Sequence, residues 1–147
     1  MYFFSLDAQG ILGVVSARLF HHLPYYYARC SLAEDDGNIQ FKSRRLHLGS
    51  LPAHFEGTYG PTNSKVDVES GSLEEFLTER YRYYTEAQDG SLRYAAIDHE
   101  PWPLYKADPT IETNTLFEAN GFAYPETEPM HYYSPDVTTI ASQNRRV

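Results

Sequence analysis

The alternation of apolar and polar residues predicts a protein built mainly from antiparallel strands. Residues 25–34 alternate with a period of two, which is the period of a strand. The segment Asp35-Asp36-Gly37-Asn38 follows, and Gly and Asn favour a tight turn because they tolerate positive φ. Residues 39–48 then read as the returning strand. The pattern therefore predicts one long hairpin over residues 25–48.

Other segments complete an α+β pattern around this hairpin. Asp7 can cap a helix over residues 8–21, where apolar residues recur at helical spacing. Ser72 and Glu75 form a capping box, which predicts a second helix over residues 73–87. We also expect strands over residues 1–6, 53–59, 91–98, 130–134 and 136–140, and a short helix over residues 114–120. The predicted fold class is α+β, a mostly antiparallel sheet or partial barrel with two or three flanking helices.

Length and composition limit the class of protein. The 147 residues predict a single domain over residues 1–147, and 41% hydrophobic residues can form one core. Cys30 is the only cysteine, which excludes an internal disulfide and favours a reducing, cytoplasmic compartment. The net charge of −8 argues against nucleic acid and anionic membrane as partners, and no apolar stretch is long enough to span a membrane.

Recognisable catalytic motifs are absent from the sequence. It has no nucleophile elbow, phosphate-binding glycine loop, zinc-protease helix motif or dinucleotide fingerprint. The six histidines lack the spacing that makes metal ligands converge, so we expect neither a metal site nor a cofactor. Cys30 lies among apolar positions and is expected to pack as a small hydrophobe.

A basic run around Arg45 holds the most informative charge. Ile39 and Phe41 mark the apolar face of this strand, and alternation places Arg45 on the same face. An arginine on a buried face needs an acid or an anionic ligand, because an unpaired buried charge is very costly. One alternative is a salt bridge to Glu75 or Glu79 of the predicted helix. The other is a carboxylate ligand.

In the second alternative, the side chain of Arg45 and the hydroxyl of Tyr25 or Tyr27 together bind the carboxylate of the ligand. Trp102, between two prolines, is expected beside them at the mouth of a barrel pocket. The leading functional prediction is therefore a protein that binds a small carboxylate-bearing molecule. A lysine-dependent enzyme acting on a small keto acid is the rival, with Lys106 as the candidate residue. A structural or oligomer-forming remnant is the third alternative.

Five segments occur in an order that resembles the YqjF-like family of uncharacterised bacterial proteins. They are Phe3-Phe4-Ser5-Leu6-Asp7-Ala8, Leu23-Pro24-Tyr25-Tyr26, Ser43-Arg44-Arg45, Phe76-Leu77-Thr78-Glu79-Arg80-Tyr81 and Pro101-Trp102-Pro103-Leu104. The family is similar in fold to acetoacetate decarboxylase, so the resemblance implies a closed or cone-shaped β-barrel with helices outside it.

The resemblance does not extend to the decarboxylase chemistry. Acetoacetate decarboxylase forms a Schiff base through a lysine whose pKa is lowered by a cationic neighbour and by burial. The three lysines here are Lys42, Lys65 and Lys106, and none has a lysine neighbour in the sequence. We therefore do not expect decarboxylase activity.

The chain begins inside a predicted strand, without a polar lead-in. Members of the family usually carry several strands before the segment that matches Tyr2 to Asp7. The resemblance thus implies that this chain corresponds to the C-terminal part of the usual domain. Strand edges left open by such a truncation pair readily with other chains. We therefore expect a homodimer that completes its sheet in trans near Tyr2 to Leu6, or a marginally stable species.

Overall fold

The computed structural model describes the backbone of residues 1–147 and every side chain except that of residue 63. Within these residues the chain forms twelve strands and three helices. In chain order they are β1 (Leu6–Ala8), α1 (Ile11–Phe20), β2 (Tyr25–Asp35), β3 (Asn38–Arg45), β4 (His54–Tyr59), β5 (Pro61–Lys65), α2 (Leu73–Thr78), β6 (Arg82–Glu86), β7 (Leu92–His99), β8 (Tyr105–Ala107), β9 (Thr110–Asn114), α3 (Leu116–Ala119), β10 (Tyr132–Tyr133), β11 (Thr139–Ala141) and β12 (Arg145–Arg146).

The strands form three hydrogen-bonded sheets. The first has five strands in the order β1-β2-β3-β4-β9, and the second has the order β10-β8-β5. In the third, β7 pairs with β6, β11 and β12. Pairing is antiparallel throughout these sheets except between β1 and β2. The prediction of an α+β fold dominated by antiparallel strands is confirmed.

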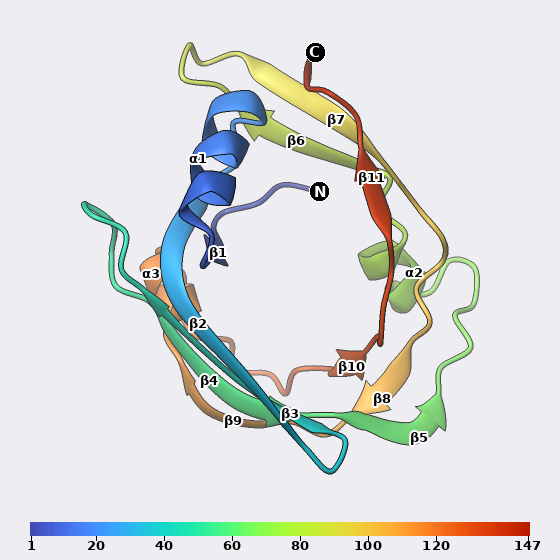
Figure 1. Ribbon diagram of the computed structural model, residues 1–147. Helices are drawn as coiled ribbons and strands as arrows, with labels where there is room; N and C mark the ends of the chain where they lie inside the picture. The colour runs from blue at the N-terminus through green and yellow to red at the C-terminus, as the bar shows by residue number, and fades with distance from the viewer.

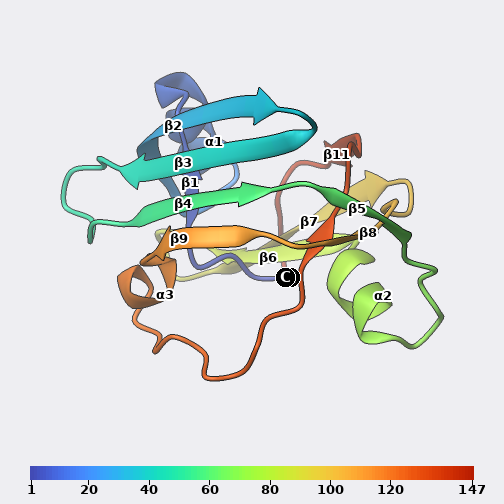
Figure 2. The ribbon, with the colours of Figure 1, turned by 90° about the horizontal axis from the view of Figure 1, so that it is seen from below.

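The sheets lie in a ring around the N-terminal segment (Figure 1). Seen after a quarter turn, β2, β3, β4 and β9 lie side by side as one layer (Figure 2). No strand ladder joins the three sheets into one within the described part of the chain. The closed barrel implied by the resemblance is therefore not found, and the sheets remain open.

The β2–β3 hairpin confirms the prediction made from residues 25–48. Its ladder pairs Asp35 with Asn38 and runs without interruption to the pair of Ala28 with Arg45. Asp36 and Gly37 form the turn with φ of 46° and 78°, the left-handed region that a two-residue hairpin turn requires. The returning strand ends at Arg45, three residues earlier than predicted.

The predicted helix over residues 73–87 is wrong in its second half. Ser72 caps α2 as expected, since its side chain accepts a hydrogen bond from the Glu75 backbone nitrogen. The helix ends at Thr78, however, and strand β6 follows, paired with β7. The segment Arg82–Glu86 consists of Arg-Tyr-Tyr-Thr-Glu, in which the tyrosines and the threonine favour a strand. Asp89-Gly90 supplies the turn that lets this strand pair with the next one.

The N-terminal segment links two of the sheets. A single bridge joins Tyr2 to Tyr84 of β6, whereas β1 lies parallel to the start of β2. The predicted strand over residues 1–6 is thus only partly formed. Helix α1 begins at Ile11 after Gly10, and the Gly10 cap contributes no side-chain hydrogen bond. The prediction that Asp7 caps this helix is therefore wrong, and Asp7 lies in β1 instead.

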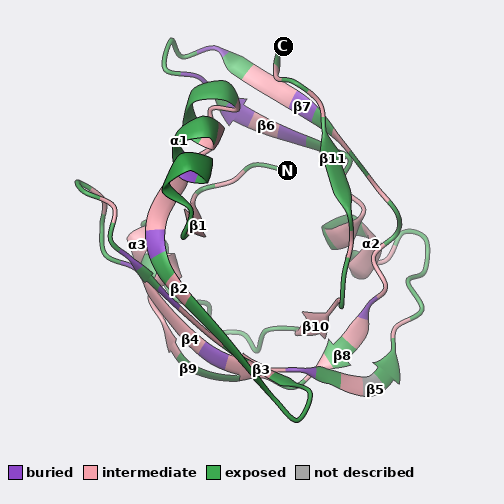
Figure 3. Cartoon of the chain, viewed as in Figure 1, coloured by how far each residue is buried: buried purple, intermediate pink, exposed green. Residues whose placement is uncertain are grey.

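The core of the chain is thin. Its buried apolar residues are mostly small and are Val14, Ala28, Ala53, Tyr83, Ala87, Ala95 and Leu104. Many larger apolar side chains stay exposed, most visibly along the outer face of α1 (Figure 3). The sequence contains enough hydrophobic residues for a larger core, but the open sheets leave much of that apolar surface uncovered.

Candidate functional site

A cavity of about 920 Å³ lies between the N-terminal segment, the five-stranded sheet and the region of α3. Its wall is largely apolar and aromatic. The apolar lining residues are Tyr2, Phe3, Phe4, Leu6, Phe41, Phe55, Leu116, Phe117, Phe122, Ala123 and Pro125. Its remaining lining residues, which we call the polar end, are Ser5, Asp7, Ser43, Asn114 and Asn120. Ligand sites typically combine such an apolar wall with a few polar groups that fix orientation.

Arg45 supports the polar end from behind. It is the last residue of β3, it is only 5% exposed, and its Nε donates to Asp7 Oδ1 at 2.7 Å. The ring of Tyr26 lies against the guanidinium, with Cζ 4.3 Å from the ring centroid. The prediction that Arg45 is buried and paired with a carboxylate is confirmed. The predicted partners Glu75 and Glu79 are wrong.

Asp7 is the partner because of the parallel pairing of β1 with β2. That register sets Asp7 beside Tyr26, and the hairpin sets Ala28 beside Arg45. Residues 26 and 28 share one face of β2, so both neighbouring strands bring their charged residue to that face. Parallel pairing between segments separated by a helix leaves no local sequence signal, which is why the partner was missed.

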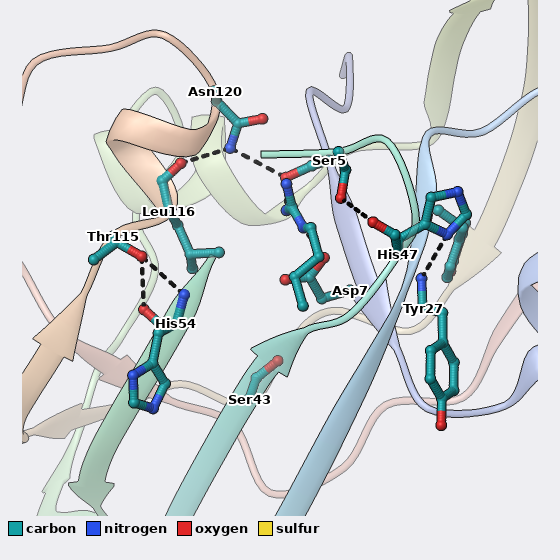
Figure 4. A network of polar contacts seen from close by, with 12 residues as sticks. Ser5, Asp7, Tyr27, Ser43, His47, His54, Thr115, Leu116 and Asn120 are labelled. Carbon is teal, nitrogen blue, oxygen red and sulfur yellow. Dashed lines mark hydrogen bonds and ion pairs between the residues drawn. The ribbon is translucent and has the colours of Figure 1, made fainter. Parts of the chain in front are cut away.

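Ser5 connects the ion pair to the cavity. Its Oγ accepts from Arg45 Nη2 at 3.0 Å and from Asn120 Nδ2 at 3.1 Å. Asn120 is the residue that ends α3, and the same nitrogen donates to the Leu116 carbonyl at 2.7 Å. Figure 4 shows Asn120 reaching from α3 toward Ser5, with Asp7 close by.

The hydrogen bonds of Ser5 leave one group free. A serine hydroxyl has two acceptor lone pairs and one proton to donate. Both lone pairs of Ser5 are occupied by the donors from Arg45 and Asn120. Among the described side chains, no group accepts the Ser5 proton in a hydrogen bond. Since Ser5 lines the cavity, its hydroxyl can donate to an oxygen of a bound molecule.

Tyr25 and Tyr27 lie on the face of β2 opposite to Arg45. The Tyr25 carbonyl accepts from Arg18 Nη1, and the Tyr27 backbone nitrogen donates to His47 Nδ1. The structure therefore does not bring these two hydroxyls together with Arg45, and the neighbouring Tyr26 contacts the guanidinium instead. The two-residue turn could have shown this, because it fixes Ala28 opposite Arg45 and so places Tyr26 on the shared face.

Trp102 lines a different cavity. This smaller space of about 360 Å³ is bordered by Trp102, Arg80, His99 and Phe3 among others, and Arg45 is not part of its lining. The Trp102 backbone nitrogen donates to Glu79 Oε1 at 3.4 Å, and its ring meets the His99 ring edge-on. The expected group of Arg45, Tyr25, Tyr27 and Trp102 is therefore not assembled as one site.

The lysines lie outside the lining of the 920 Å³ cavity. Lys106 is exposed on β8, and Lys42 forms an ion pair with Glu56 of β4. In the described part of the chain, no three His, Cys, Asp or Glu side chains are grouped so as to hold a metal ion. None of the described helices has the length and hydropathy needed to cross a membrane.

Comparison with known proteins assigns the chain to a family. The model of DUF2071, described as an uncharacterized conserved protein, matches residues 1–138. The chain belongs to the DUF2071 family. The uncharacterized protein YqjF of Bacillus subtilis (strain 168) is 40% identical over 134 residues, which cover 91% of this chain and 54% of YqjF. The chain thus spans about half the length of this curated relative, and the resemblance to YqjF-like proteins is confirmed.

Segments that carry the family resemblance meet at the cavity. Two of the five segments that carry the resemblance, residues 3–8 and 43–45, meet at the polar end through Ser5, Asp7 and Arg45. The description of the family names no ligand or reaction. The chemistry of the site must therefore come from its geometry.

Proposed function

We propose that this DUF2071 protein binds an apolar molecule that carries a carboxylate or carbonyl oxygen at one end. The hydroxyl of Ser5 is the observation that carries the proposal. Two donors occupy its lone pairs, which leaves its proton free to donate to an acceptor in the cavity. The aromatic wall would hold the apolar body of the same molecule.

Electrostatics favour an oxygen acceptor at this position. The positive charge of Arg45 lies directly behind Ser5, with Nη2 3.0 Å from the hydroxyl oxygen. Hydrogen bonds that involve charged partners are shorter and stronger than neutral ones. Asp7 balances the charge of Arg45, so the pocket does not need an anion to neutralise it. The ligand oxygen is therefore recognised through Ser5 and not by direct contact with the guanidinium.

The size of the cavity favours a ligand larger than a simple keto acid. A volume of about 920 Å³ corresponds to ~30 water molecules at about 30 Å³ each. A small keto acid would leave most of the aromatic wall in contact with water. An acyl chain or a ring system attached to the carboxylate would fill more of this space.

A lysine-dependent reaction has no support from the cavity lining, which contains no lysine. Lys106 as a catalytic residue stays a prediction. We also propose that the fold is related to that of acetoacetate decarboxylase and that the protein acts in the cytoplasm. Family membership and the antiparallel sheets support the first of these proposals, and the single cysteine supports the second.

Calorimetric titration with matched probes tests the binding proposal. Decanoate should bind, whereas decanol, whose hydroxyl oxygen is a weaker hydrogen-bond acceptor than a carboxylate, and pyruvate, which lacks the apolar body, should bind at least tenfold more weakly. Ser5→Ala should weaken decanoate binding about tenfold or more, because a hydrogen bond to a charged group contributes ~1.5–3 kcal/mol. Ser50→Ala, which removes a hydroxyl directed at the His47 carbonyl, is the matched control and should leave binding unchanged.

Two results would contradict the proposal. Equal decanoate affinity for the wild type and Ser5→Ala would remove the role of the hydroxyl. A lysine mass shift after borohydride treatment with a small keto acid would instead support the lysine-dependent enzyme. Lys106→Ala, tested in the same way, would show whether Lys106 is the residue that reacts.

A further inference from the structure

Helix α1 presents an apolar stripe that the described part of the chain leaves exposed. Ile11, Leu12, Val15 and Leu19 are all exposed, with Leu12 at 86%. At 100° per residue these four side chains fall within an arc of about 100°. An arc of this width is typical of a helix face that packs against another element. We call these four residues the α1 stripe.

The side of α1 that adjoins Ile11, where Val14 and Arg18 lie, holds the helix in place. Val14 is 2% exposed, and Arg18 donates from Nη1 to the Tyr25 carbonyl of β2. The guanidinium of Arg18 also lies 5.6 Å from the Tyr26 ring centroid. The helix is thus fixed on the sheet through Val14 and Arg18, while most of its other residues are exposed (Figure 3).

The loop after β3 also carries exposed apolar residues. The His47 ring of this loop packs against the same Tyr26 ring that Arg18 contacts, at 5.3 Å between centroids. Leu46, Leu48 and Leu51 of this loop are exposed.

The total surface of the chain indicates how much area a partner could cover. The chain exposes 10429 Å². A compact monomer of 16.9 kDa is expected to expose about 7,700 Å², which leaves an excess of about 2,700 Å². A standard interface buries ~800 Å² per partner, and obligate homodimers bury more. The excess, summed over the whole chain, is larger than the area that each partner of a standard dimer buries.

We infer that the α1 stripe packs against the α1 stripe of a second copy of this chain, antiparallel and across a two-fold axis. The same apolar patch on both copies satisfies an isologous contact. The chain has a net charge of −8, so two copies repel each other over most of their surface. Arg18 is the one charged residue of α1 and faces β2, so the stripe itself brings no like charges together.

A lipid surface is a poorer occupant of the stripe. Helices that lie on membranes usually carry several Lys and Arg on their polar face. α1 has only Arg18, which is engaged by its own sheet, and the acidic chain is repelled by anionic lipid.

The N-terminal segment is also a poorer dimer contact, although the sequence predicted one near Tyr2 to Leu6. The Tyr84 backbone nitrogen donates to the Met1 carbonyl, and the Leu6 backbone nitrogen donates to the Pro24 carbonyl. These bonds tie both ends of the segment to sheets of its own chain. The inferred partner is therefore still a second copy of the chain, as the sequence predicted, but the contact lies at α1 and not near Tyr2 to Leu6.

Sedimentation velocity of the full chain tests the inference. The wild type should sediment as a dimer, and Val15→Glu should weaken dimerisation ~100-fold or more, because a buried unpaired carboxylate is strongly unfavourable. Leu32→Glu is the matched control. Leu32 is also exposed, at 65%, but lies near the turn end of the β2–β3 hairpin, and this variant should remain dimeric.

Cross-linking provides a second readout that does not depend on a disruptive charge. Val15 lies midway along α1, so in an antiparallel pair it faces its own equivalent. Val15→Cys combined with Cys30→Ser should form a cross-linked dimer on mild oxidation, and Leu32→Cys in the same background should not.

Three outcomes would overturn the inference. The first is a wild-type chain that stays monomeric, including one that binds vesicles of neutral lipid through α1. The second is a dimer that survives Val15→Glu but is lost in Phe4→Glu, which would return the contact to the N-terminal segment. The third is a continuous range of aggregates without a discrete dimer.

Discussion

The cavity wall and the α1 stripe are both apolar, yet they differ in what lies at their edges. The cavity ends in a group of polar side chains, in which Asp7 and Ser5 hold the buried Arg45 in place. The α1 stripe has no charged side chain among its members. Fixed polar groups orient a small molecule, whereas a charge-free stripe suits a surface recognised through packing alone. The proposed ligand site and the proposed contact with a second copy thus lie on different surfaces.

The polar side chains at the cavity contribute to the folding stability of the isolated chain, whereas the α1 stripe contributes little. The Arg45–Asp7 pair is nearly removed from solvent, with side-chain exposures of 2% and 11%. Breaking a buried pair by removing one partner leaves an uncompensated charge. Residues of the stripe contribute little to the isolated chain because they are exposed.

Asp7→Ala should have the largest effect on folding. It leaves the guanidinium of Arg45 buried without its carboxylate, and we expect a loss of ~3–5 kcal/mol in the free energy of unfolding. Urea denaturation measures this change. Asp7→Asn keeps an oxygen acceptor and should lose less. A loss below about 1 kcal/mol for Asp7→Ala would mean that Arg45 finds another partner or reaches water.

Ser5→Ala should have an intermediate effect. Arg45 Nη2 and Asn120 Nδ2 both lose an acceptor, so we expect a loss of ~1–3 kcal/mol in the free energy of unfolding. Ser50→Ala, measured in the same urea series, should lose less because its hydroxyl makes one hydrogen bond to a backbone carbonyl. Equal losses for the two variants would show that Ser5 is not a junction of the buried network.

The α1 stripe should make the thermal unfolding midpoint depend on protein concentration, and should have little effect on the stability of the monomer. If the stripe joins two copies, the midpoint of thermal unfolding rises with chain concentration, because dimerisation stabilises only the folded chain. Val15→Glu should abolish this dependence while leaving the midpoint of the dilute chain within a few degrees of the wild type. A concentration-independent midpoint for the wild type would contradict the dimer.

The pair of Tyr132 and Glu74 lies outside both regions and should give the smallest effect. The hydroxyl of Tyr132 donates to Glu74 Oε1 at 2.6 Å, and this hydrogen bond lowers the pKa of Glu74 below its ordinary value of 4.5. A lowered pKa in the folded chain stabilises the fold above pH 4.5, and the contribution is lost as the pH falls through the folded-state pKa. Tyr132→Phe should therefore lower the unfolding midpoint slightly at pH 7, and by less as the pH falls below 4.5. A difference that does not shrink on acidification would exclude this linkage.

Local sequence signals predicted the elements that depend on neighbouring residues. The two-residue turn at Asp36-Gly37 fixed the hairpin, and Ser72 with Glu75 marked the start of α2. The strand period placed Arg45 on a buried face. Each of these outcomes follows from contacts within a few residues or across one tight turn.

Elements that depend on distant partners were not predictable in the same way. The segment Arg82–Glu86 fits a helical stripe as well as a strand, and pairing with β7 decides between them. Asp7 can cap a helix or pair with an arginine, and the parallel register of β1 with β2 selects the second role. Ser5 and Asn120 are separated by 115 residues, so no spacing rule could connect them.

A crystal structure of the chain soaked with decanoate would show directly whether Ser5 recognises a carboxylate. We expect a carboxylate oxygen within ~2.5–3.0 Å of Ser5 Oγ and the acyl chain along the aromatic wall that contains Phe41 and Phe55. A cavity without decanoate, or decanoate bound beside Arg80 and Trp102 in the smaller cavity, would contradict it.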